Sequence, residues 1–165
     1  MSVDQLASEE DAANSDRHAE RVRFREEQRR HWSTVQWDNN LAIDRHIELL
    51  RSFERGDRNH NVPLEDFDMP WPILSRPLSF SIAQIQREWV SKFYDAVRER
   101  EGYSHTDIAQ LIRRCIKVFH QDKLISRLRD VDDDEDKELV NEVAKLVFLE
   151  LYAQLQRQRG DDSDN

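Results

Sequence analysis

Residues 108–123 read IAQLIRRCIKVFHQDK, and this stretch carries the clearest helical pattern in the 165-residue chain. Its apolar side chains recur at intervals of three and four residues, which places them on one face of an α-helix. Arg113, Arg114 and Lys117 fall on the opposite face. The pattern therefore predicts a helix with a buried stripe and a basic ridge.

Two further helical patterns lie on either side of this helix. One spans about residues 81–100, and the other begins in the acidic run Asp132–Asp136 and continues to about Gln156. Acidic side chains favour a helix start because they face the positive end of the helix dipole. Ser104 or Thr106 offers an N-cap for the helix between the two. We therefore expect three successive helices in the second half of the chain.

The chain before these patterns divides by composition. Residues 17–55 are rich in Arg and Glu and carry apolar side chains at helical intervals. A break is expected at Asp38–Asn40, because Asp and Asn side chains form local bonds with the backbone that compete with a helix. Residues 1–16 and 158–165 are acidic and poor in apolar side chains, so they are expected to be disordered tails.

Residues 56–80 lie between the two helical regions and contain Pro63, Pro70 and Pro72. Proline does not continue a helix, so this segment predicts a proline-containing extended linker or wrap. Its apolar side chains are numerous enough to lie on a neighbouring surface. We expect Trp71 and Trp89 to join the wrap to the C-terminal helices.

The overall composition favours an all-α fold. Only three glycines and four prolines occur, too few for the many tight turns of a sandwich or barrel, and Gly-rich phosphate loops are excluded. The single cysteine, Cys115, cannot form an internal disulfide, which favours a reducing, intracellular compartment. No apolar run is long enough to cross a membrane. The sequence offers no cofactor motif.

Charge is distributed unevenly along the chain. The formal net charge is −9, yet residues 105–129 carry +4 and residues 130–165 carry −8. An asymmetry of this kind concerns partners rather than the fold. The basic helix and its C-terminal end are therefore the first place to look for function.

The helix runs directly into His120-Gln121-Asp122-Lys123, and here the chain resembles a J-domain. In that family a basic helix leads through a His-Pro-Asp loop to an antiparallel partner helix. The chain is similar in particular to the J-like C-terminal region of the NF-kappa-B inhibitor-like family, including its short fungal members. The matching pieces, in order, are Arg17–Arg30, Met69–Leu74, His120–Leu124 and Asp132–Asp136.

The resemblance implies a J-domain-like unit over residues 81–157 that acts as a co-chaperone of a DnaK-type heat-shock chaperone. It implies that Arg113, Arg114, Lys117 and Lys123 steer association, while His120 and Asp122 trigger ATP hydrolysis by the partner. Gln121 stands where the family has proline. Proline restricts its own backbone and that of the preceding residue, so glutamine implies a looser loop over residues 120–131.

Simpler interpretations of the same residues remain open. His120 and Asp122 would also suit the end of a helix, and the basic ridge would also suit a solvated helix face. A degenerate J-like unit that binds without stimulating, or binds another protein, is equally compatible. On the chaperone interpretation, Arg114→Glu is expected to weaken binding without unfolding the protein.

A nuclear RNA-processing or nucleic-acid-associated factor is the alternative of a different class. Clustered arginines at positions 21, 23, 25, 29 and 30 suit phosphate contacts, although Glu20, Glu26 and Glu27 dilute them. Pairs such as Glu26 with Arg30 explain the pattern as intrahelical stabilisation. The sequence does not distinguish nucleus from cytoplasm.

An enzyme is the least favoured class. No nucleophile and base are arranged as catalysis requires, and Cys115 is expected in the core. No small-molecule substrate is indicated. Four histidines are spaced too widely for a compact metal site and are expected to be exposed: His18, His31, His46 and His60.

Overall fold

The computed structural model describes residues 2–56 and 64–163, and within them it is all-α, as the sequence predicts. No β-strand occurs in these two ranges. The α-helices are α1 (Val3–Thr34), α2 (Asn39–Arg55), α3 (Arg87–Glu99), α4 (His105–Phe119), α5 (Gln121–Arg127) and α6 (Asp134–Ser163). Short 3₁₀ helices are η1 (Asp66–Asp68), η2 (Ile82–Gln84) and η3 (Leu128–Asp130).

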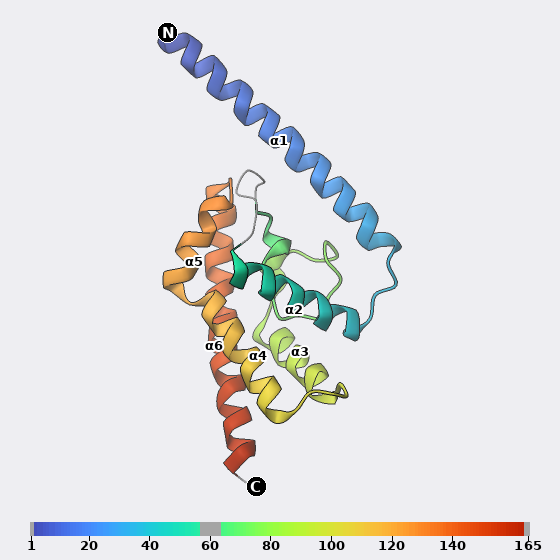
Figure 1. Ribbon diagram of the computed structural model, residues 1–165. Coiled ribbons are helices and arrows are strands. Elements are labelled where there is room, and N and C mark those ends of the chain that lie inside the picture. The colour runs from blue at the N-terminus through green and yellow to red at the C-terminus, as the bar shows by residue number, and fades with distance from the viewer. Residues whose placement is uncertain (1, 57–63, 164–165) are drawn as a thin grey trace.

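The centre of the body is the pairing of α4 with α6, which run side by side in opposite directions (Figure 1). At the start of α4, Nε2 of His105 lies 2.8 Å from the carbonyl oxygen of Gln158. At its end, His120 packs on Phe148. Helices α2 and α3 pack against this pair and complete one core.

Helix α4 matches its predicted pattern closely. Ser104 caps it: its side chain accepts a bond from the backbone N–H of Asp107, and the Asp107 carboxylate accepts one from the Ser104 N–H. Ile112 and Cys115 of its apolar stripe are fully buried, whereas Ile116 at the edge of the stripe is partly buried. Burial raises the pKa of the Cys115 thiol to about 12, so this thiol stays protonated at neutral pH.

The helix predicted over residues 81–100 is shorter than expected. Ser81 caps the 3₁₀ helix η2 instead, and the Gln84 side-chain oxygen accepts a hydrogen bond from the Ser81 N–H. The backbone is extended at Ile85 and Gln86, and α3 begins only at Arg87. The predicted helix is therefore divided: the capping box between Ser81 and Gln84 belongs to η2, and the α-helix begins after two extended residues.

The described residues of the segment between α2 and α3 lie on the core, and Pro63 is outside them. The Trp71 ring stacks on Phe119 of α4, with ring centroids 5.1 Å apart. Trp89 of α3 contacts Phe80 of the wrap edge to face at 5.7 Å. Both tryptophans thus join the wrap to the helices, as the sequence predicts.

Both predicted tails are helical where the structure describes them. Residues 3–16 form the first half of α1, whose start is closed by a capping box at Ser2, and no residue of α1 is buried. Alanine, glutamate and glutamine in this segment favour a helix without any core. At the other end α6 continues to Ser163, and Gln158 is buried beside His105. The break before α2 covers residues 35–38, so it meets the predicted break only at Asp38, which caps α2; Asn39 and Asn40 already belong to the helix.

The histidines differ from the expectation at one position. His18 and His31 are exposed and His60 lies outside the described residues, but His46 on α2 is buried and packs edge to face on Phe93. The burial of His46 could have been predicted from its position on the apolar stripe of α2. Burial lowers the pKa of His46 to about 3, because the charged ring would lose its hydration.

This buried ring predicts loss of stability in acid. The unfolded chain binds a proton at His46 near the ordinary pKa of 6.5, whereas the folded protein does so only near 3. Between those pH values, the contribution of His46 lowers the free energy of unfolding by about 1.4 kcal/mol for each unit by which the pH falls. Urea unfolding from pH 7 to pH 4 should therefore be less steeply pH-dependent in His46→Phe than in wild type. His18→Phe is the matched control, and equal slopes for all three proteins would refute the account.

Candidate functional site

The predicted basic ridge lies on the outer surface of α4 and continues onto α5. Arg113 and Lys117 are exposed one turn apart on α4, and Lys123 is exposed in the first turn of α5. They follow the face opposite the buried stripe, as the sequence pattern predicts. The structure thus places three of the four predicted cations at the surface.

Arg114 differs from the other three because it is paired within the protein. Its Nε donates to the Glu54 carboxylate on α2 at 3.0 and 3.2 Å, and its second guanidinium nitrogen also contacts this carboxylate. The hydrogen bond from Arg114 lowers the pKa of Glu54. Arg114 therefore fastens α2 to α4, which periodicity within α4 could not reveal.

The connection after α4 is helical rather than a loop. His120 ends α4 and caps α5, with Nδ1 accepting a 3.3 Å bond from the N–H of Asp122. Gln121, Asp122 and Lys123 form the first turn of α5. Because His120 satisfies a terminal N–H that would otherwise lack an acceptor, a new helix can start one residue after the last one ends.

The His120 ring is held against α6 by aromatic contacts. It meets Phe148 edge to face at 6.0 Å, and Phe148 meets Tyr152 in the same manner at 4.9 Å. The sequence pattern did not predict a contact between these rings and His120. The available signal was their spacing of four residues beside the buried stripe of α6.

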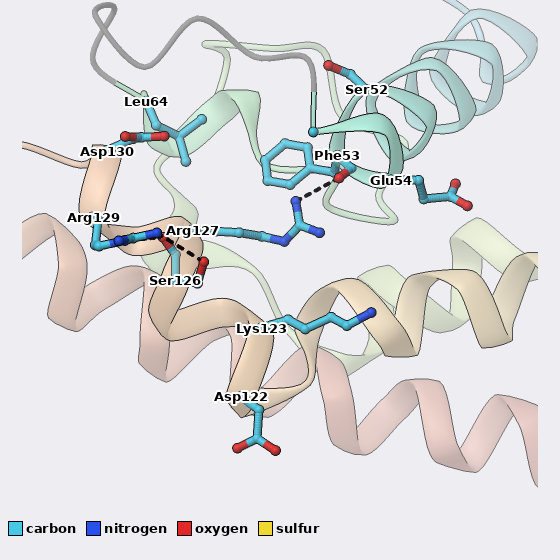
Figure 2. Close-up of a pocket in the computed structure, with 11 residues that line it drawn as sticks. Ser52, Phe53, Glu54, Leu64, Asp122, Lys123, Ser126, Arg127, Arg129 and Asp130 are labelled. Atoms are coloured by element: carbon cyan, nitrogen blue, oxygen red, sulfur yellow. Dashed lines mark hydrogen bonds between the residues drawn. The ribbon is translucent and has the colours of Figure 1, made fainter.

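A cavity of about 580 Å³ lies on the other side of this turn, between α2 and α5. Figure 2 shows Arg127 reaching from α5 to α2, where it donates a 3.0 Å bond to the Phe53 carbonyl and lies over the Phe53 ring. Burial lowers the pKa of Arg127. Lys123 lines the same cavity, while the Asp122 carboxylate points away from it. No histidine or cysteine is among the described residues that line it.

A second charged site fastens α1 to the body around Glu65, a carboxylate only 1% exposed. Arg21 donates to one Glu65 oxygen at 2.8 Å and Arg25 to the other at 2.9 and 2.6 Å. A buried carboxylate is tolerated when such partners replace its hydration. Arg21 and Arg25 therefore have an internal role.

The same row of arginines reaches the start of α6. Nε of Arg17 donates to both carboxylate oxygens of Asp132, at 2.8 and 2.7 Å, and Arg21 donates to Asp136 at 2.8 Å. Positions 17, 21 and 25 are spaced four residues apart and share one face of a helix. The acidic run predicted only as a helix start is thus also the docking site of α1.

Metal sites and membrane-spanning helices are both absent from the described residues. Within residues 2–56 and 64–163, no group of three or more His, Cys, Asp or Glu side chains is arranged to hold a metal ion. Across those same ranges, no helix combines the length and apolar character needed to cross a membrane.

Comparisons with protein-family models, curated proteins and solved structures all found no match.

The Arg114 pair generates a stability prediction. Arg114→Glu would set two carboxylates against each other and should lower the free energy of unfolding by about 1–2 kcal/mol, because an attraction becomes a repulsion. Adding Glu54→Arg in the same chain should restore most of the loss. The variant is still expected to fold, but it is less suitable for testing chaperone binding alone, because Arg114 is paired with Glu54.

Urea unfolding measures the effect, and Arg113→Glu is the matched control because Arg113 is exposed on the same helix. Equal stability of the two single variants would contradict the assigned pairing.

Proposed function

We propose that this chain is a non-enzymatic protein-interaction module, a divergent J-domain-like unit that docks on an acidic surface of a DnaK-type heat-shock chaperone. The observation that carries the proposal is the exposed basic ridge of α4, which leads directly to the His120 turn. In this proposal Arg113, Lys117 and Lys123 steer association, and His120 with Asp122 contacts the partner. Arg114 is left out because it is paired with Glu54.

The helix arrangement supports the proposal. Helices α3, α4 and α6 follow one another along the chain, and α4 and α6 run antiparallel with the His120 turn at the end of α4 (Figure 1). The family it resembles uses this order. The short helix α5 between α4 and α6 departs from a simple loop.

The backbone at the turn also supports it, because proline would fit where glutamine stands. His120 has φ −62° and ψ 135°, the extended conformation that a residue before proline adopts. Gln121 is the first residue of α5, the helix position where proline is best tolerated. A proline in place of Gln121 would therefore be compatible with the backbone of this turn.

Electrostatics favours an acidic partner for this face. Residues 105–129 carry a net charge of +4 in a protein of net charge −9, so a local basic surface stands out from an acidic whole. Complementary charge raises association rates and selects partners. Retention in a reducing compartment, nucleus or cytoplasm, is part of the proposal.

The nucleic-acid alternative is weakened because Arg21 and Arg25, two of its five clustered arginines, have an internal role. Arg17, Arg21 and Arg25 are all bonded to carboxylates of the body. Phosphate contacts by these side chains would require those bonds to break. A salt titration of RNA binding distinguishes the classes, since binding that is strong at low salt and lost steeply with added salt would favour the alternative.

Steady-state ATPase of a DnaK-type chaperone tests the proposal. We expect stimulation by the wild-type protein, greater stimulation by Gln121→Pro because proline stiffens the turn, and none by His120→Gln. Gln121→Pro should change the free energy of unfolding by no more than about 1 kcal/mol. Folded proteins that all leave the ATPase rate unchanged would refute the co-chaperone role.

Binding is measured separately from stimulation. Arg113→Glu combined with Lys117→Glu should slow association with the chaperone by about tenfold at low salt. Lys92→Glu, an exposed reversal on α3 away from the ridge, is the matched control. Equal association rates for the two variants would show that the basic ridge does not steer association with the chaperone.

A further inference from the structure

One face of the α4–α6 pair combines exposed apolar side chains with cations. Leu149 is 59% exposed and Tyr152 is 45% exposed on α6. Phe148 lies between His120 and Tyr152 and is half-buried. Large apolar side chains gathered in this way mark interaction surfaces more often than scattered ones do.

The cations of this face come from both helices. The antiparallel pairing, fixed by His105 with Gln158 and by His120 with Phe148, brings Arg113 level with Tyr152. Lys145 is exposed and precedes Leu149 by one turn of α6. We define the α4–α6 face as Arg113, Lys117, His120, Lys145, Phe148, Leu149 and Tyr152. Its complement is a helix that carries both acidic and apolar side chains.

The first half of α1 has this character. Residues 1–16 carry a net charge of −5 and no cation. Val3 is 81% exposed and Leu6 is 52% exposed, and they lie three residues apart on one face of the helix. This segment would be marginal alone, because short isolated helices in water are only partly formed.

The segment points away from its own body. Arg17 and Arg21 fasten the middle of α1 at Asp132 and Asp136. From there the first half of the helix extends beyond the other helices (Figure 1). Its 14 helical residues from Val3 to Asp16 span about 21 Å, long enough to follow several turns of another helix. A contact with a second molecule therefore suits it better than a contact within the chain.

We propose that the protein self-associates, with the acidic first half of α1 of one copy docked on the α4–α6 face of a second copy. The exchange is reciprocal and gives a two-fold dimer, the commonest symmetry of soluble oligomers. Val3 and Leu6 meet Phe148, Leu149 and Tyr152, and the flanking carboxylates meet Arg113, Lys117 and Lys145. The contact is small and charged, so it is reversible and weakens with added salt.

This inference rests on the basic ridge that the proposed function also uses. The dimer covers Arg113 and Lys117, and it therefore competes with chaperone docking. Self-association requires no chaperone, whereas ATPase stimulation requires no dimer, so the two proposals fail independently.

Sedimentation equilibrium of the full chain tests the dimer first. The wild-type protein should show an average mass that rises with concentration above the 19.8 kDa of the monomer and falls back at high salt. A mass that stays at the monomer value at every concentration would overturn the proposal.

A charge exchange tests the assigned surfaces. The face variant carries Arg113→Glu, Lys117→Glu and Lys145→Glu, and the helix variant carries Glu9→Lys, Glu10→Lys and Asp11→Lys. Each variant alone should have a dissociation constant raised by about tenfold or more, because like charges then face each other. Lys92→Glu is the control and should associate as wild type does.

The mixture of the two variants is decisive. The acidic helix of the face variant then meets a basic face, and the basic helix of the helix variant meets an acidic face. Both contacts are restored, so the mixed sample should associate about as tightly as wild type. If the mixture stays monomeric, or if either variant alone still dimerises as wild type does, the assignment is wrong.

The helix variant also separates the two proposals. It keeps the ridge and the His120 turn intact, so it should stimulate the chaperone ATPase at least as well as wild type while remaining monomeric. A helix variant that stays monomeric without stimulating ATPase would support the dimer and count against the co-chaperone role.

Discussion

The antiparallel packing of α4 on α6 is the constraint on which the rest of the structure depends. Apolar stripes on both helices are fully buried against each other and against α2, α3 and the wrap. Because this contact fixes α4 along its whole length, the polar face of α4 must face outwards and its end must lie at Phe148. Packing thus converts a simple periodic pattern into a surface where cations, a histidine and aromatic rings lie together.

Ion pairs, rather than apolar packing, determine the position of α1 on the body. Helix α1 buries no side chain, and paired carboxylates hold it: Glu65 with Arg21 and Arg25, and the start of α6 with Arg17 and Arg21. Ion pairs of this kind depend on geometry and on salt far more than apolar contacts do. The core therefore determines the structure of the body, whereas the position of α1 depends on arginines whose partners in the body cannot be inferred from the sequence of α1.

Local patterns predicted the elements better than the contacts between them. The stripe of α4, the Ser104 cap and the break at Asp38 follow from residues within a few positions of one another. The Arg17–Asp132 pair joins residues 115 positions apart, and no local pattern reports such a pair. Helix α5 was missed because its cap is His120, an uncommon capping residue. Arg113, Lys117 and Lys123 are exposed on the face that the helical pattern predicts, but the pattern could not show that Arg114 pairs with Glu54.

Native-state hydrogen exchange tests the central claim, that the α4–α6 pair is the cooperative centre that holds the His120 turn in place. Buried amides of α4 and α6 should be the most protected and should lose protection together as denaturant is added, because each helix completes the other. Amides of residues 3–16 should exchange rapidly in dilute protein. Loss of protection in α6 at lower denaturant than in α4 would contradict the account, since the turn would then have no fixed support.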